Sequence, residues 1–169
     1  MHLLSFRWLL LFIVLATVAL LGFGIYLQKV LGIEPCPLCI FQRIGFIAVG
    51  VLALFAALHN PRPLGRRLWA LLIVLAALAG GSVSARHVWL RHLPADQVPD
   101  CGPGLAYMLD AFPLGKTIKD VFTGSGECAT PDGWWFLGLD MPSWALVWFA
   151  GFSLIALYAG FFARGKPSK

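Results

Sequence analysis

Four stretches of mostly apolar residues, each separated from the next by polar segments, dominate the hydropathy pattern of the chain. They cover residues 8–28, 38–58, 68–88 and 143–163. A helix needs about 20 apolar residues to cross a bilayer, and helices and closed barrels are the structures that satisfy every backbone group in lipid. The pattern therefore predicts an all-α membrane protein, a four-transmembrane-helix bundle that forms a single membrane domain over residues 1–169.

The segments between the apolar stretches carry turn and helix-start signals. The first stretch has no charge between Arg7 and Lys29 and is longer than the apolar region of a signal peptide, so we expect it to be a span. Asn60-Pro61-Arg62-Pro63 is a turn signal, and Met141-Pro142 places a proline where helices begin. One side of the membrane then receives a short loop, residues 29–37, and a long loop, residues 89–142.

Composition and charge agree with a membrane protein and give it an orientation. The chain is 59% hydrophobic and 12% charged, far from the balance of a soluble domain, and this composition argues against disorder and against nucleic-acid binding. Its net charge of +5 comes from basic residues at the termini and in the second loop, whereas all acidic residues fall in the other two loops. The positive-inside rule predicts that both termini are cytoplasmic and that residues 29–37 and 89–142 lie on the opposite side, which in a bacterial inner membrane would be the periplasm.

All four cysteines fall on the predicted periplasmic side, where disulfide chemistry is possible. Cys36-Pro37-Leu38-Cys39 stands at the mouth of the second span. If a helix begins near Pro37, its N-terminal N–H groups and dipole stabilise a thiolate. Arg43 lies four residues after Cys39, on the same helix face, so its guanidinium can favour the ionised form of Cys39.

These residues have other uses in proteins. A structural zinc site needs a second closely spaced ligand pair, which the chain lacks, so we expect no metal. A static disulfide between Cys36 and Cys39 closes almost no loop and stabilises little, which favours redox exchange. The alternative for Arg43 is a side chain that snorkels to the lipid headgroups.

Cys101 and Cys128 leave two interpretations open. A bridge between them would close a long loop and contribute about 3.6 kcal/mol in the chain-entropy model, which suits a structural staple. Both cysteines have glycine-rich neighbours, and such exposed settings suit exchange with the thiols of another protein.

His87 lies at the outer end of the third span, at about the depth of Cys39 and Arg43. It is either an interfacial histidine or a group that handles protons or binds a ligand. A pocket lined by Cys39, Arg43 and His87 and walled by aromatic residues could hold a flat, lipophilic electron acceptor. A membrane quinone is the expected ligand.

Taken together, these features resemble the disulfide bond formation protein B (DsbB) family of bacterial thiol:quinone oxidoreductases. The resemblance covers nearly the whole chain. It rests on Cys36-Pro37-Leu38-Cys39 followed by Ile40-Phe41-Gln42-Arg43, on the separated pair Cys101 and Cys128, and on Trp135-Phe136-Leu137-Gly138-Leu139-Asp140-Met141-Pro142 before the fourth span.

The resemblance implies disulfides Cys36–Cys39 and Cys101–Cys128 and a route for two electrons between them. A reduced DsbA-like periplasmic thiol oxidase would attack Cys101 and release Cys128, and Cys128 would attack Cys36. Cys39 would be freed as a thiolate and give its electrons to ubiquinone, or to menaquinone, through a charge-transfer contact. Arg43 would stabilise the charge, and His87 is the best match to a histidine that the family places near the quinone.

Two rival functions come from different classes. A vitamin K epoxide reductase-like protein also joins cysteine pairs to a quinone in a helical bundle, but its Cys-x-x-Cys opens a later helix. A structural membrane protein with two static disulfides would need no turnover.

Overall fold

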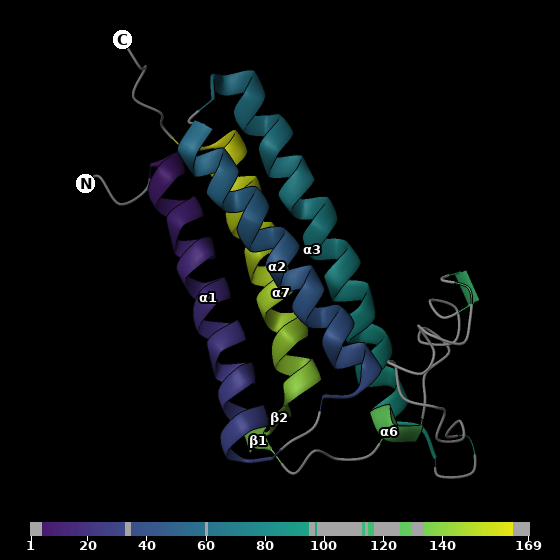
Figure 1. The fold of residues 1–169 in the computed structure, drawn as a ribbon. Coiled ribbons are helices and arrows are strands. Elements are labelled where there is room, and N and C mark those ends of the chain that lie inside the picture. Colours follow the sequence, from purple (N-terminus) through teal and green to yellow (C-terminus); the bar gives the residue numbers. More distant parts are fainter. Residues whose placement is uncertain are drawn as a thin grey trace.

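Four long helices lie side by side and build the molecule (Figure 1). The computed structural model describes residues 5–32, 35–59, 61–94, 97, 113, 115–116, 126–129 and 134–163. The long helices are α1 (Phe6–Val30), α2 (Pro37–His59), α3 (Pro63–Arg91) and α7 (Met141–Phe161). All four are long and apolar enough to cross a membrane, which confirms the predicted all-α membrane architecture.

The smaller elements gather at one end of the bundle (Figure 1). There α2 begins and α3 ends, and we call it the cysteine end. It carries the short helix α6 (Gly126–Ala129) and an antiparallel pair of strands, β1 (Trp135–Phe136) and β2 (Leu139–Asp140). A two-residue turn joins the strands with positive φ at Leu137 and Gly138, the geometry of a tight hairpin. The hairpin leads directly into α7.

The helices differ from the predicted apolar stretches mainly at their ends. α2 begins at Pro37 and α7 begins one residue before Pro142, as the proline signals predict. α3 extends from Pro63 to Arg91, well beyond residues 68–88, because a helical backbone tolerates flanking arginines until Pro94. α7 ends at Phe161, before the predicted residue 163.

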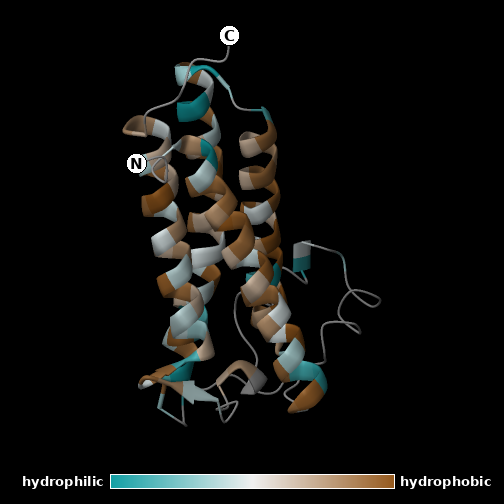
Figure 2. Cartoon of the chain, turned by 90° about the vertical axis from the view of Figure 1, so that its left-hand side faces the viewer, coloured by the Kyte–Doolittle hydropathy of each residue, from teal (hydrophilic) through white to brown (hydrophobic). Residues whose placement is uncertain are grey.

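The middle turns of the long helices are mostly apolar, as Figure 2 shows by their brown colour. Leu15 on α1, Leu75 on α3 and Leu154 on α7 are 63–70% exposed although they lie in mid-helix. Such exposure would be costly in water over so large a surface and is expected where lipid covers the helices.

The main core lies between the four long helices, and its aromatic centre is where α2, α3 and α7 meet. Phe46 stacks on Phe149 with ring centroids 4.1 Å apart, and Phe152 meets Phe46 edge-on. Gly45 and Gly80 make room for these rings: a Cβ on Gly45 would lie 3.0 Å from the Cα of Gly80, and one on Gly80 would overlap the Phe149 ring. Close approach through small residues is a common way to pack helices in lipid.

A second, smaller cluster lies at the cysteine end. Leu38 of α2 and Val83 and Leu90 of α3 pack there with Cys128 of α6, and Cys36 packs against them. This cluster connects the described part of the long loop to the start of α2.

Candidate functional site

Cys36 caps the first turn of α2. Its carbonyl accepts the first helical hydrogen bond from the N–H of Ile40 at 3.2 Å, and its sulfur accepts from the N–H of Cys39 at 3.4 Å. This is the arrangement of a side-chain N-cap with sulfur in place of oxygen, and Pro37 occupies the favoured first helical position. The Cys36 and Cys39 sulfurs lie 3.1 Å apart, and the Cys36 thiol donates to the Cys39 sulfur. The local sequence thus brings both thiols to the positive end of α2.

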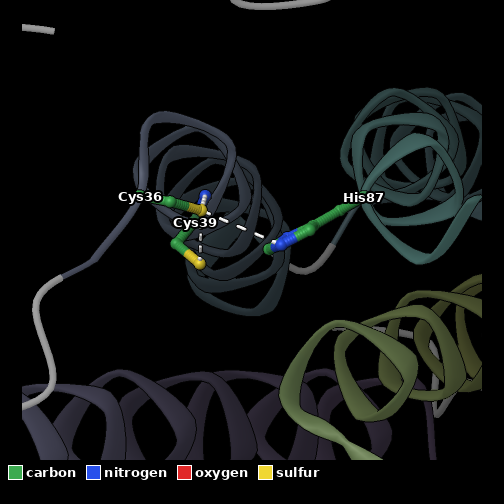
Figure 3. A group of neighbouring side chains, drawn as sticks. All are labelled: Cys36, Cys39 and His87. Atoms are coloured by element: carbon green, nitrogen blue, oxygen red, sulfur yellow. Dashed lines mark hydrogen bonds between the residues drawn. The ribbon is translucent and has the colours of Figure 1, made fainter. Parts of the chain in front are cut away.

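His87 reaches from α3 to the same thiols (Figure 3). Its Nε2 lies 3.8 Å from the Cys36 sulfur and 3.1 Å from the carbonyl oxygen of Cys128, while its Nδ1 lies 3.2 Å from the side-chain nitrogen of Gln42. The imidazole is 3% exposed, so these groups are its surroundings.

The contacts of His87 define how the ring is protonated. A carbonyl oxygen only accepts hydrogen bonds, so Nε2 carries a hydrogen and donates to Cys128. The side-chain nitrogen of Gln42 lies within hydrogen-bond distance of Nδ1, the other ring nitrogen. The N–H at Nε2 therefore faces Cys36 as a donor, and a donor beside sulfur stabilises a thiolate.

Cys128 is buried, contrary to the exposed setting that its glycine-rich neighbours predicted. It is 1% exposed and packs with Leu38, Val83 and Leu90, beside Cys36. The physical reason is that α6 docks on α3, where apolar side chains and the bond from His87 receive it. Cys101 lies outside the described residues, so its predicted exposure and its bridge to Cys128 stay predictions, as does the Cys36–Cys39 disulfide.

The Arg43 side chain of α2 forms hydrogen bonds with α1. It donates from Nη1 to the side-chain oxygen of Gln28 at 2.7 Å and from Nη2 to the carbonyl of Gly24 at 3.1 Å. These bonds hold the guanidinium between α1 and α2, in contrast to the alternative of a side chain extended to the headgroups. Its predicted effect on Cys39 stays a prediction.

A cavity of about 860 Å³ opens beside the thiols, bounded by α1, α2, α3, the hairpin and α7. The walls are mostly apolar and aromatic, and the polar groups among them are few: Cys36, Cys39, Gln42, Arg43, His87 and Arg91. The three residues predicted to line a pocket, Cys39, Arg43 and His87, all line this one. Its size and lining are those of a site for a small organic molecule.

Aromatic side chains from three elements cover one side of the cavity. Trp134 meets Phe23 of α1 edge-on at 5.5 Å, and Phe136 of β1 packs against both Trp134 and Trp144 of α7. The Trp144 indole also donates to the carbonyl of Phe136 at 3.0 Å. The sequence predicted a pocket walled by aromatic residues, and the structure identifies Trp134 and Trp144 among them.

Arg91 was assigned no role from the sequence, and Asp140 was named only as part of the segment before the fourth span. Their side chains form an ion pair of 2.9 Å between the end of α3 and the start of α7. The signal available was the spacing of His87 and Arg91, four residues apart on one helix face.

Cys36, Cys39 and His87 bring three potential metal-ligating atoms within 4.8 Å of one another. The same group suits disulfide exchange, because two thiols and an N–H donor are what that chemistry requires. The expectation of no metal stays a prediction.

Known proteins of one kind match the chain over most of its length. The family model for "Disulfide bond formation protein DsbB" matches residues 6–159. A disulfide bond formation protein B of Chromobacterium violaceum is 56% identical over 131 residues, 78% of each chain. Proteins of the same name from Saccharophagus degradans and Acinetobacter baumannii are 50% and 49% identical over 156 residues, 92% of this chain and 93% and 91% of theirs.

Proposed function

Because the chain belongs to the DsbB family of disulfide bond formation proteins, we propose that it reoxidises a DsbA-like periplasmic dithiol protein and passes the electrons to a membrane quinone. One observation carries the proposal. Cys36 packs against the cluster that contains the buried Cys128, and both Cys36 and Cys39 line the aromatic cavity. Electrons can therefore reach the pair from a thiol and leave it towards a ligand.

The thiol steps begin from two disulfides, Cys36–Cys39 and Cys101–Cys128. A thiolate of the reduced partner attacks Cys101, which forms a mixed disulfide and releases the Cys128 thiolate. The Cys128 thiolate attacks Cys36, which forms a Cys36–Cys128 bridge and releases the Cys39 thiolate. The second partner thiolate then attacks the partner's own sulfur in the mixed disulfide, so the partner leaves oxidised and Cys101 leaves reduced.

The pairs are then restored within the chain. The Cys101 thiolate attacks Cys128, re-forms the Cys101–Cys128 bridge and releases the Cys36 thiolate, beside which lies the N–H of His87. Cys36 and Cys39 together lose two electrons and rebuild their disulfide. A quinone in the cavity supplies this chemistry because it takes up two electrons and two protons.

The cavity fits such a ligand in size and in lining. Its volume of about 860 Å³ suits an aromatic headgroup, and Phe46, Trp144 and Trp148 offer flat surfaces for a ring. Arg43 offers N–H donors from a position that Gln28 and Gly24 hold in place. Cys39 opens onto the same space. Ubiquinone is the acceptor we propose, with menaquinone as the variant.

The experiment combines the purified chain, a reduced DsbA-like protein and ubiquinone, and follows quinone absorbance alongside thiol content. We expect one quinone to be consumed for each dithiol oxidised. Cys39→Ala should abolish quinone consumption while the Cys101–Cys128 pair still exchanges with the partner. His92→Ala is the matched control, because His92 is an exposed residue just beyond α3.

Two results would contradict the proposal in different ways. Exchange with the partner while wild-type quinone stays oxidised would remove the quinone from the function. No exchange of any cysteine pair would favour the structural membrane protein with static disulfides.

A further inference from the structure

Arg91, which forms an ion pair with Asp140, is part of the cavity wall. The two side chains are only 5% and 4% exposed, and Nε of Arg91 lies 2.9 Å from Oδ2 of Asp140. Arg91 lines the cavity together with His87, one helical turn before it on α3. The guanidinium also lies over the Trp135 ring, 5.9 Å from its centroid.

A buried ion pair contributes little net stability to the contact between two helices. Desolvation of both charges offsets much of their attraction, and apolar replacements of similar volume are often as stable. Ionisable residues in membrane-embedded structure are therefore functional candidates by default. The place of Arg91 in the cavity wall shows where such a function would act.

Asp140 holds Arg91 through a rigid connection. Its Oδ2 binds Arg91, while its Oδ1 accepts from the N–H of Ser143 and caps α7. The carboxylate is thus fixed at both oxygens, and the guanidinium attached to it is fixed relative to α7. Preorganised donors of this kind bind a ligand at a smaller entropic cost than mobile ones.

Two anchored guanidinium groups line the cavity at different depths. Arg43 lies in the second turn of α2 and is tied to α1, whereas Arg91 is the last residue of α3 and is tied to the start of α7. The start of α2 and the end of α3 both lie at the cysteine end (Figure 1), so Arg43, in the second turn of α2, lies farther from that end than Arg91.

We propose that Arg91 is a second acceptor-binding residue, which donates a hydrogen bond to one carbonyl oxygen of the quinone ring while Arg43 serves the other. This inference rests on the proposed function and extends it. A benzoquinone carries two carbonyl oxygens on opposite sides of the ring, and both gain negative charge on reduction. Donors at two depths match that symmetry and favour the reduced ring over the oxidised one.

The test measures binding to the full chain in detergent by quenching of tryptophan fluorescence, since Trp134, Trp144 and Trp148 line the cavity. The probes are decylubiquinone and the corresponding decyl-substituted benzene, which lacks both carbonyl oxygens. Arg91→Met keeps much of the side-chain volume but removes every donor. We expect it to raise the Kd of decylubiquinone about tenfold or more and to leave that of the benzene unchanged.

Three further variants separate binding from folding. Arg91→Met alone strands the Asp140 charge, so Arg91→Met/Asp140→Asn removes both charges while Asn still caps α7. The double variant should bind decylubiquinone as weakly as the single variant, with a thermal midpoint closer to that of the wild type. Arg91→Lys should recover part of the affinity. Arg86→Met is the matched control. Arg86 is another arginine of α3 whose guanidinium lies over a tryptophan ring, that of Trp89, but it is not among the residues that line the cavity.

Each remaining outcome has a defined meaning. If the double variant binds decylubiquinone as tightly as the wild type, the pair is a structural clamp and the inference is wrong. Equal losses for both probes would also contradict it, because the cavity would have changed shape. If the wild type shows no preference for the quinone over the benzene, the proposed function itself fails.

Discussion

His87 is the residue at which the parts of the site meet. Its Nδ1 contacts the side-chain nitrogen of Gln42 of α2. Its Nε2 lies near both the Cys128 carbonyl oxygen and the Cys36 sulfur. Because Nε2 donates to α6, the docking of α6 and the orientation of the donor near Cys36 depend on each other. A role in the exchange between Cys128 and Cys36 therefore follows more directly than a role at the acceptor alone.

His87→Ala should slow the exchange between Cys128 and Cys36 by about tenfold or more, since a hydrogen bond to a charged group contributes about 1.5–3 kcal/mol. Rapid acid quenching and mass spectrometry of the Cys36–Cys128 bridge would measure the rate. His87→Gln should recover part of it, because an amide N–H can also donate. His92→Ala should leave it unchanged. An unaltered rate in His87→Ala would remove this residue from the exchange.

At the scale of the elements, the three-helix contact at Gly80 has no space for a side chain. Gly80→Ala should destabilise the fold by about 1–3 kcal/mol, because its Cβ would overlap the Phe149 ring. Thermal unfolding in detergent measures the change. Gly151→Ala on α7 is the control, since nothing lies within 4 Å of the Cβ that it adds. Equal midpoints for both variants would show that α3 and α7 separate easily.

The elements themselves were largely predictable, and their contacts were not. Apolar length and the prolines at positions 37 and 142 predict four helices and two of their starts, since both signals are local. The burial of Cys128 depends on where α6 docks, which no neighbouring residue encodes. Arg91 and Asp140 are far apart in the chain, and only the packing of α3 against α7 brings them together.

The predicted site shows the same division. The sequence could group Cys36, Cys39 and Arg43 because the three residues fall within two turns at the start of one helix. The prediction that His87 lies near them depended on a further assumption, that the second span begins and the third span ends at a similar depth in the membrane. Aromatic walls were predicted for the pocket, but which aromatic residues form them depends on packing, and only the structure assigns Trp134 and Trp144 to the cavity.

At the scale of the whole molecule, the chain is a multi-pass membrane protein of disulfide bond formation, and its orientation can be tested directly. Leu64 and Leu137 are 80% and 78% exposed, near the start of α3 and in the hairpin turn. In a cysteine-free background, we expect Leu137→Cys to react with a membrane-impermeant maleimide in spheroplasts. Leu64→Cys should react only after the inner membrane is permeabilised. The opposite pattern would reverse the orientation.

The separation of the two apolar clusters has a mechanical consequence. Among the described residues, the main core between the long helices shares no member with the small cluster around Leu38, Val83, Leu90 and Cys128. In the proposed cycle, the bonds that Cys36 forms with Cys39 and with Cys128 are made and broken beside the smaller cluster. Disulfide bonds can therefore be exchanged at one end of the bundle while the packing of the helices against each other and against lipid stays the same.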